Sequence, residues 1–279
     1  MIKPQKLLFA PAGIPLSTIP RDTGNGIRRT SSLGLGALEL EFVQSVYVTK
    51  DAAPAIKKIA QEGGVLLTCH ASYYINLNAV DAQKRAASRD RVLASAKILH
   101  ACGGYSVCFH PGFYLGKPSH EAYLVVKDEL SKILEKVNSL GLDVWIRPET
   151  TGKPMQFGSI DELVDLSSEF DNVLPVVDFS HLHARTNGKF NTEEEFTQVM
   201  ELIEKKLGKD ALHNMHVHLS GINYGPKGEK NHLVLEESDM NYRGVLKVLK
   251  DFGARGVVVC ESPNIEEDAL LLQKTYNEL

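Results

Sequence analysis

Histidine and acidic residues end several short apolar runs in this 279-residue chain. One run, from Val65 to Cys69, ends at His70, and the pattern recurs at intervals of roughly 30 to 45 residues, which suits one strand plus one crossover helix per unit. Imidazole and carboxylate groups that converge from separate strand ends are typical metal ligands. The residues that end the six runs are His70, His110, Glu149, Asp178, His218 and Glu261, and His181 closely follows Asp178.

The number of these ligands indicates more than one metal ion. Zinc or manganese takes about three or four protein ligands, so seven candidates imply two or three ions. A carboxylate such as Glu149 can bridge two ions, and two ions about 4 Å apart can clamp a phosphoryl group and lower the pKa of a bound water. A lone histidine at a strand end is more often a satisfied loop residue, but six ligand-type residues at successive strand ends favour a metal site.

Several polar residues near these ligands keep more than one interpretation. His216 shares a strand face with His218 but lies deeper in the expected fold. His183 is interpreted either as a loop residue or as a support behind the ligands. Glu39 and Glu41 share one strand face and are expected to be structural or to support the ligands.

Composition narrows the class of protein. Hydrophobic content of 43% and charged content of 24% are ordinary for a globular chain, and a net charge of -4 gives no global basic field of the kind that many nucleic-acid binders carry. The four cysteines form no C-x-x-C pair and are expected to be small buried residues in a reduced compartment. No signal peptide and no apolar run of membrane-spanning length is recognisable, so we expect a cytoplasmic protein.

Strand and helix patterns alternate along the whole chain. This unbroken alternation predicts a single-domain (β/α)8 barrel over residues 1–279, in which the strand C-termini, and with them all the ligand candidates, share one face. Ser119 and Thr192 are the expected N-caps of their helices, and residues 220–237 are expected to form a long polar loop. The expected helices cover residues 31–35, 50–62, 76–102, 119–140, 159–170, 193–207, 238–252 and 265–279.

Basic residues are frequent on the face that would hold the site. Arg147 shares a strand face with Glu149 and is a candidate partner for a buried carboxylate. Bound metal ions and basic loops would together make this face electropositive, which suits a phosphate-bearing substrate, whereas the alternative is a set of ordinary solvated loops. The basic loop residues are Lys117, Lys153, Arg185, Lys189, Lys227 and Lys230.

Two adjacent tyrosines follow the first ligand. Tyr73 and Tyr74 come directly after the His70 strand end, on an expected loop beside the site. An exposed aromatic ring there could stack on a base or wedge into a base step. The alternative is that at least one of the two rings packs under the following helix.

Taken together, the motifs resemble endonuclease IV, the family 2 apurinic/apyrimidinic endonucleases. Residues 70–77, HASYYINL, resemble that family's H-x-S-Y-x-I-N-L signature, and residues 109–112, FHPG, resemble its H-P-G strand end. Residues 149–152 are similar to its E-N-T-A-G, residues 178–181 to D-T-C-H, residues 218–219 to the start of H-L-N-D, and residues 261–263 to E-T-P. The resemblance spans expected strands three to eight.

The resemblance implies a (β/α)8 barrel with a cluster of up to three zinc ions. Such an enzyme hydrolyses the phosphodiester 5′ to an abasic site in duplex DNA through metal-activated hydroxide, a step of base excision repair, and we expect this chain to do so as a monomer. The first ion would be held by His70, His110 and Glu149. Glu149 would bridge to a second ion, and Glu149 and Glu261 would be the catalytic carboxylates. The remaining implied ligands are Asp178, His218 and Glu261 for the second ion and His181 for the third, with Tyr73 and Tyr74 contacting DNA.

The chain departs from the family pattern in three loops. The family's D-x-H, which completes the third ion, has no clean match, and Glu229 and His232 are the expected substitutes. The Asn-Asp after the strand-seven histidine becomes Ser220-Gly221, and an arginine-containing loop becomes residues 44–47, QSVY. These changes concern the third ion and the grip on DNA.

Another enzyme class shares the implied architecture. Sugar isomerases and epimerases of the xylose isomerase-like group use the same barrel with a His, Asp and Glu metal site, so fold alone does not separate the two. The Tyr73 motif and the presence of seven or more ligands, where four would suffice, favour the endonuclease. The complete first ligand set disfavours a third interpretation, an inert DNA-binding relative.

Overall fold

Eight parallel strands form the centre of the molecule in a computed structural model, which describes residues 3–279. They make two four-stranded sheets, ordered β2-β3-β4-β6 and β1-β12-β9-β8. Bridges from Ala12 to Glu39 and from Glu149 to Val176 join the sheets and close the barrel. The strands are β1 (Leu7–Pro11), β2 (Ala37–Glu41), β3 (Leu66–His70), β4 (Ser106–Phe109), β6 (Trp145–Pro148), β8 (Val176–Asp178), β9 (Met215–His218) and β12 (Gly256–Cys260).

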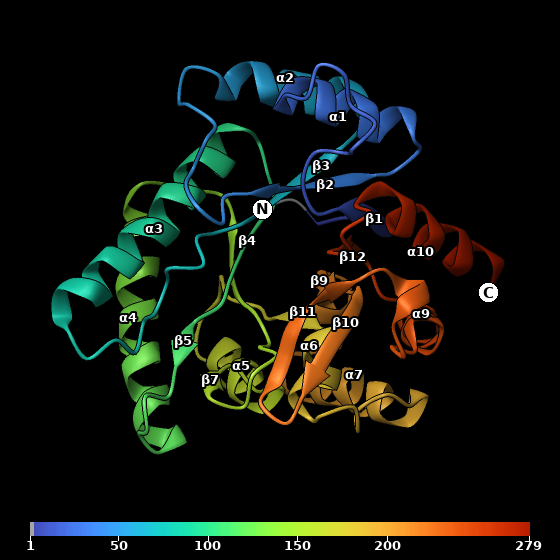
Figure 1. Cartoon of the computed structure of the whole chain (residues 1–279). Helices are drawn as coiled ribbons and strands as arrows, with labels where there is room; N and C mark the ends of the chain where they lie inside the picture. The colour runs from blue at the N-terminus through green and yellow to red at the C-terminus, as the bar shows by residue number, and fades with distance from the viewer. Residues whose placement is uncertain (1–2) are drawn as a thin grey trace.

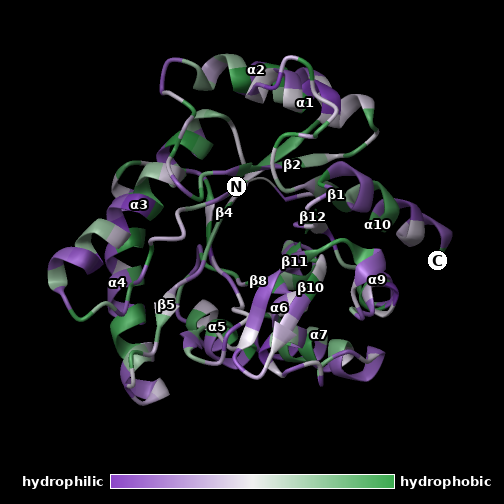
Figure 2. Ribbon diagram, in the orientation of Figure 1, coloured by the Kyte–Doolittle hydropathy of each residue, from purple (hydrophilic) through white to green (hydrophobic). Residues whose placement is uncertain are grey.

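Helices surround the strands in chain order, so the colour in Figure 1 runs around the ring from blue to red. Figure 2 shows the central strands mostly in hydrophobic green, while the helices also carry hydrophilic purple. The predicted (β/α)8 architecture is therefore confirmed. Within residues 3–279, the helices are too short or too polar to cross a membrane. They are α1 (Thr23–Ser32), α2 (Ala53–Gly63), α3 (Ala82–Ala101), α4 (Ser119–Ser139), α5 (Ile160–Ser168), α6 (Phe179–Arg185), α7 (Glu193–Leu207), α8 (Lys209–Leu212), α9 (Tyr242–Asp251), α10 (Glu266–Glu278) and the 3-10 turn Leu235–Glu237.

A helix begins where the sequence predicts if its N-cap side chain makes the expected hydrogen bonds. Thr192 and Glu195 form a reciprocal capping box at the start of α7, as expected for that helix. The expected cap at Ser119 is wrong: Pro118 occupies the cap position of α4, and the Ser119 hydroxyl donates instead to Glu162 on α5. Ser119 is the first helical residue and not the cap, and its hydroxyl joins α4 to α5.

Two helices begin at least six residues away from the start that the sequence predicts. The expected helix at 31–35 is wrong, because α1 begins eight residues earlier, where the Asp22 side chain accepts from the backbone N–H of Asn25. Gly24 and Gly26 hid this helix, since glycine is a poor helix former. An added Cβ on Gly26 would lie 3.0 Å from Ile14, so close packing explains that glycine. The expected helix at 76–102 begins only at residue 82, because Asp81 is the cap.

The prediction that residues 220–237 form a loop is wrong. Two antiparallel strands, β10 (Gly221–Gly225) and β11 (Gly228–Leu233), form a hairpin with a register shift between Asn223 and Tyr224. Its polar strands contact α6 at the C-terminal end of the barrel. A second small pair, β5 (Gly112–Phe113) with β7 (Gln156–Phe157), links two other loops at this end.

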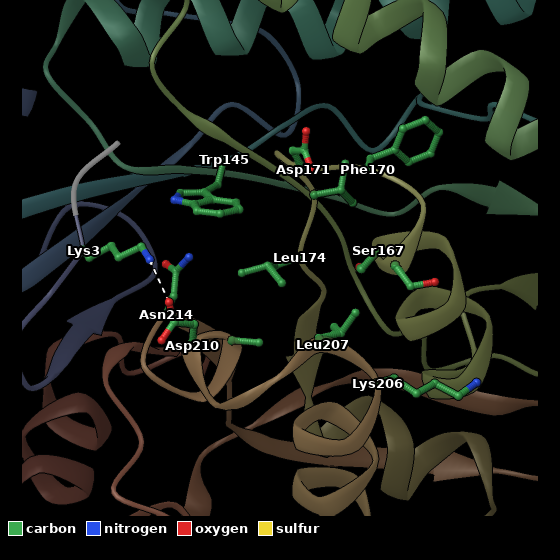
Figure 3. Close-up of a pocket in the computed structure, with 13 residues that line it drawn as sticks. Lys3, Trp145, Ser167, Phe170, Asp171, Leu174, Lys206, Leu207, Asp210 and Asn214 are labelled. Atoms are coloured by element: carbon green, nitrogen blue, oxygen red, sulfur yellow. Dashed lines mark hydrogen bonds and ion pairs between the residues drawn. The ribbon is translucent and has the colours of Figure 1, made fainter.

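A cavity of about 290 Å³ lies at the opposite end of the barrel (Figure 3). Trp145, the first residue of β6, and Asn214, which precedes β9, line it beside the ion pair of Lys3 with Asp210. Residues at this face of a (β/α)8 barrel serve stability, whereas catalytic groups gather where the strands end. The candidate site is therefore sought at the other end.

Candidate metal centre

Glu149 is the centre of the site. It follows β6 and is completely buried. Its Oε2 lies 3.1 Å from Nε2 of His70 and 3.2 Å from Nε2 of His110, while its Oε1 lies 3.0 Å from Nδ1 of His218. These histidines come from the ends of β3, β4 and β9. Each oxygen of the Glu149 carboxylate therefore has at least one imidazole beside it. This is the arrangement expected if Glu149 bridges two metal ions.

Two further carboxylates converge on the His218 side of Glu149. Asp178 ends β8, and Glu261 directly follows β12. Glu261 Oε2 lies 3.4 Å from His218 Nδ1. One ligand atom from each of Glu149, Asp178, His218 and Glu261 falls within 4.8 Å of every other, so these four residues suffice to surround a single ion.

A third group is completed by hairpin β10–β11. Glu229 Oε2 lies 3.6 Å from His181 Nε2, and His232 Nε2 lies 3.8 Å from Glu261 Oε2. The hairpin reaches this position because the Glu229 N–H donates to the carbonyl of Gly152, 2.9 Å away. A side chain on Gly152 would clash with Glu229, at 2.7 Å from its Cβ. The structure thus brings both expected substitutes, Glu229 and His232, to the site.

The tautomers of three histidines suit metal binding. Nδ1 of His70, His181 and His232 lies 2.7 to 3.1 Å from the backbone carbonyls of Ala71, Thr150 and Glu261 respectively. A carbonyl can only accept, so each Nδ1 carries a proton, and Nε2 is the nitrogen that can offer a lone pair to the site once it is deprotonated. A hydrogen bond of this kind orients a ligating histidine and makes it more basic.

Unpartnered polar atoms mark where a cation fits. Asp178 Oδ2, Glu261 Oε2 and His232 Nε2 are buried without a hydrogen bond among the described residues. Buried polar atoms are nearly always satisfied, and divalent cations satisfy this donor set of imidazole nitrogens and carboxylate oxygens. The residues therefore fit the metal ions that the sequence predicts.

The electrostatics of the site favour positive charge. Burial opposes ionisation of Glu149, but facing His218 and His110 outweigh burial and hold the pKa of Glu149 well below its usual range. Burial would lower the pKa of His70, yet its hydrogen bond and ion pair with Glu149 raise that pKa to about 10. The pKa of His218 is likewise raised far above its usual value by Glu261 and Glu149 against the effect of burial. Protons on these rings compete with metal ions, so metal binding would expel protons.

The rim carries the two tyrosines, and neither packs under the following helix. The Tyr73 and Tyr74 side chains are both more than half exposed, with ring centroids 4.2 Å apart. Arg91 of α3 lies 5.8 Å from the Tyr74 ring centroid. The expectation that at least one ring is buried is therefore wrong, and both rings face solvent beside the site.

The signature motifs are joined through Asn76. Its Oδ1 accepts from the backbone N–H of Asn78 and lies 3.4 Å from the N–H of Phe113. A side chain on Gly112, whose φ is +141°, would meet this oxygen at 2.4 Å. The asparagine of one motif and the glycine of the other thus hold the two loops that follow β3 and β4 together.

Two expected arginine roles are wrong. Arg147 is fully buried, but it donates to the Tyr105 hydroxyl and to the side chain and carbonyl of Asn214, not to a carboxylate. Arg185 donates to the carbonyls of Thr151, Lys153 and Gln156 and so braces the loop after β6. Its guanidinium is thus committed to this loop, which leaves the lysines as the basic loop residues that could meet a phosphate.

The residues with open interpretations now have positions. His216 and Glu39 lie in a buried layer beneath the ligands, where Glu39 contacts both His216 and His218. His183 is outside the site: its Nε2 lies 3.0 Å from Asp239, which also accepts from Tyr224 of the hairpin.

Two contacts of the site were not anticipated. Cys108 is buried as expected, but its thiol also donates to Glu149. Glu41 lines the cavity of about 380 Å³ above the ligands, where burial and neighbouring Glu39 raise its pKa to about 8. Both residues lie on strands that carry a ligand position or are next to one. That position is the only feature of the sequence that could have indicated these two contacts.

Comparisons with known proteins identify the family and the fold. A family model described as a xylose isomerase-like TIM barrel matches residues 27–276. An uncharacterized protein of Methanocaldococcus jannaschii is 46% identical over 273 residues, which is 98% of each chain. A probable endonuclease 4 of Mycoplasma pneumoniae is 26% identical over 204 residues, or 71% of this chain and 68% of that protein.

Two solved structures share the fold over nearly the whole chain. Endonuclease IV from Thermus thermophilus aligns with a TM-score of 0.71 and 18% identity, covering 98% of each chain. A D-tagatose 3-epimerase-like protein aligns with a TM-score of 0.74 and 18% identity, covering 97% of this chain and 96% of the other. The resemblance to endonuclease IV is confirmed by these relatives, and the chain belongs to the xylose isomerase-like TIM barrel family.

Proposed function

We propose that this protein is a metal-dependent DNA repair endonuclease that hydrolyses the phosphodiester 5′ to abasic sites. The observation that carries the proposal is the Glu149 carboxylate, with His70 and His110 on one oxygen and His218 on the other. A bridging carboxylate belongs to a site with two or more ions, and such sites are typical of phosphodiester hydrolysis. The similarity to probable endonuclease 4 supports the same class.

The proposed metal is zinc, with manganese as the alternative, in two or three ions. His70, His110 and Glu149 would hold the first ion. The second would lie between Glu149 and the group formed by Asp178, His218 and Glu261, and the third would take His181, Glu229 and His232. When bound, the ions supply a nucleophile from water at neutral pH and neutralise charge on the phosphate.

The chain's own groups would bind and orient the DNA. Tyr73 and Tyr74 stand exposed at the rim, and their rings offer a stacking surface for a base next to the lesion. Lys227 and Lys230 are exposed on hairpin β10–β11 and are suited to contact backbone phosphates. Histidines fix the carboxylates of Glu149 and Glu261. We propose that these two carboxylates orient the attacking oxygen of water and the leaving oxygen of the phosphodiester.

A sugar isomerase or epimerase is the second candidate. The specific observation in its favour is that Glu149, Asp178, His218 and Glu261 alone form a group sufficient for one ion. The likeness to the D-tagatose 3-epimerase-like protein is consistent with that class but rests on fold. In this alternative, five other candidates would be surplus to the metal site: His70, His110, His181, Glu229 and His232.

The decisive test is cleavage of a duplex oligonucleotide that carries one tetrahydrofuran abasic analogue. This analogue cannot undergo β-elimination, so a cut reports hydrolysis. We expect a cut on the 5′ side that disappears with chelator and with Glu149→Gln, but persists with Glu129→Gln, a buried glutamate on α4 paired with Arg85 and Arg89. No cut by protein with confirmed bound metal, together with C3 epimerisation of a ketohexose, would transfer the assignment to the epimerase.

A further inference from the structure

Within residues 3–279, His218 has no backbone carbonyl on either ring nitrogen in the contacts of the site, unlike His70, His181 and His232. His70, His181 and His232 place Nδ1 on a backbone carbonyl and direct Nε2 to the site. His218 does the reverse: its Nδ1 faces Glu149 and Glu261, and its Nε2 points down into the barrel. For Nδ1 to offer a lone pair to a metal ion, the ring proton must be on Nε2. An acceptor for that proton must therefore lie beneath the site.

Glu39 is the group beneath His218. It lies on β2, is completely buried, and its Oε1 is 3.0 Å from His218 Nε2. Its other oxygen, Oε2, lies 3.2 Å from His216 Nε2 and accepts from the Thr68 hydroxyl at 2.8 Å. A buried carboxylate that faces two imidazole Nε2 atoms can accept from both of their N–H groups.

The far side of this layer is also fixed. His216 Nδ1 lies 2.9 Å from the Ser106 hydroxyl on β4, which can donate to it. His216 is completely buried, with its two ring nitrogens facing Ser106 and Glu39. With Ser106 as donor to Nδ1, the His216 proton sits on Nε2 and faces Glu39. Glu39 is thereby held through Oε2 by Thr68 and His216, which leaves Oε1 facing His218 Nε2.

We propose that Glu39 is a positioning residue for the metal centre, which keeps the proton of His218 on Nε2 and presents the Nδ1 lone pair to the second ion. This inference rests on the proposed function, because it assumes that the centre binds metal. A carboxylate behind a ligating histidine fixes the ring orientation and raises its basicity, and loss of such a partner weakens metal binding by about 10- to 100-fold. His216, Ser106 and Thr68 act through Glu39 and not on the metal.

The test is Glu39→Gln, measured by metal binding without any DNA. The amide nitrogen can donate to His218 Nε2, which would move the ring proton to Nδ1 and turn the ligand away from the ion. We expect one class of bound ion to weaken by about 10- to 100-fold in competition with a chromophoric chelator. The visible absorption of the cobalt-substituted protein is expected to change, because one nitrogen ligand is altered.

Two further variants separate positioning from folding. Glu129→Gln alters a buried glutamate on α4 that pairs with Arg85 and Arg89 outside the centre, so its metal affinity and cobalt spectrum are expected to stay near wild type. Glu39→Asp retains the charge on a shorter side chain and is expected to fall between wild type and Glu39→Gln. The Asp variant keeps the proposal testable if the Gln variant does not fold, since folding is monitored by circular dichroism.

The outcomes discriminate the inference from the proposed function. Unchanged affinity and an unchanged cobalt spectrum in Glu39→Gln overturn the positioning role. Loss of one whole ion with no change at the others also overturns it, because Glu39 would then be a ligand itself, as its grouping with His216 and His218 allows. A wild-type protein that takes up no divalent ion instead contradicts the proposed function.

Discussion

The ligand-type residues on the barrel strands and those on hairpin β10–β11 reach one cavity by different routes. In the strand set, the side chains of His70, Glu149 and His218 are at most 9% exposed and make contacts of 3.0 to 3.1 Å, while the His110 side chain is 26% exposed. The hairpin set is looser: Glu229 and His232 contact their partners at 3.6 and 3.8 Å, and their side chains are 15% and 27% exposed.

The difference follows from what holds each backbone. Strand ends are fixed by ladders on both sides; His70, for example, is paired with Glu41 on β2 and with Cys108 on β4. The hairpin is fixed by docking, through the Glu229 N–H on Gly152 and through Tyr224, which donates to Asp239. We infer that the strand set is the more rigid part of the centre. We also infer that the hairpin tolerates a change in the spacing of its ligands along the chain, because its position does not depend on the barrel strand ladders.

Glu149→Gln is expected to have the largest effect, since this residue connects the two sides of the strand set. Loss of the bridging charge should weaken two ions at once and reduce abasic-site cleavage by roughly 100-fold or more, the upper end for an altered metal site. Elemental analysis and cleavage rates measure this. Equal metal content in Glu149→Gln and in the Glu129→Gln control would contradict the central role of Glu149 in the strand set.

The stability of the chelated protein is expected to depend on pH through the same strand set. The pKa of His70 is raised from 6.5 to about 10, and that of Glu41 from 4.5 to about 8. Both groups bind more protons in the folded than in the unfolded chain over these ranges. Between about pH 4 and 6.5 the lowered pKa of His216 acts in the opposite direction, so the free energy of unfolding should fall as pH rises from about 6.5 to about 10. Urea denaturation at several pH values tests the sign.

Metal should reverse this trend, because ions replace the protons and bind more tightly as pH rises. The matched arm is the same titration with saturating zinc. A chelated protein that gains stability between pH ~6.5 and ~9 would show that the ionisable groups of the strand set do not hold protons in place of metal.

His232→Asn is expected to have an intermediate effect that is confined to the hairpin side. It should weaken one ion by about 10- to 100-fold while the ions of the strand set keep their affinity, because their ligands lie on other elements. Calorimetric metal titration resolves the classes of site. The control is His183→Asn, a buried histidine on Asp239 and outside the centre. Loss of all ions in His232→Asn would show that the two sets are not separable.

Tyr224→Phe is expected to have the smallest effect. It removes the hydroxyl that donates to Asp239 at 2.5 Å, which should cost about 1 kcal/mol of hairpin docking. Hydrogen exchange should rise in β10 and β11 and not in the barrel strands, and cleavage should change by only a few-fold. Faster exchange across the whole barrel would mean that the hairpin and the strands open as one unit.

The barrel and its strand-end residues were predictable because both depend on short-range patterns. An apolar run that stops at a ligand-type residue places that residue at a strand end, and parallel closure then gathers the strand ends on one face. Helix α7 was predicted for a similar reason, since Thr192 and Glu195 form a cap within four residues. Helix α1 was missed because two of its residues are glycines that pack closely against Ile14 and Ile59.

The sequence by itself determined which side chains reach the catalytic face, because alternation along a strand and closure of the barrel leave few other positions for them. Only the tertiary structure decided how they act together. Glu39 and His216 became one buried layer beneath His218 because β2, β4 and β9 face each other across the barrel interior. Glu229 and His232 reached the site because a polar segment folded into a hairpin and docked on Gly152. These contacts join residues far apart in the chain, and no local pattern encodes them.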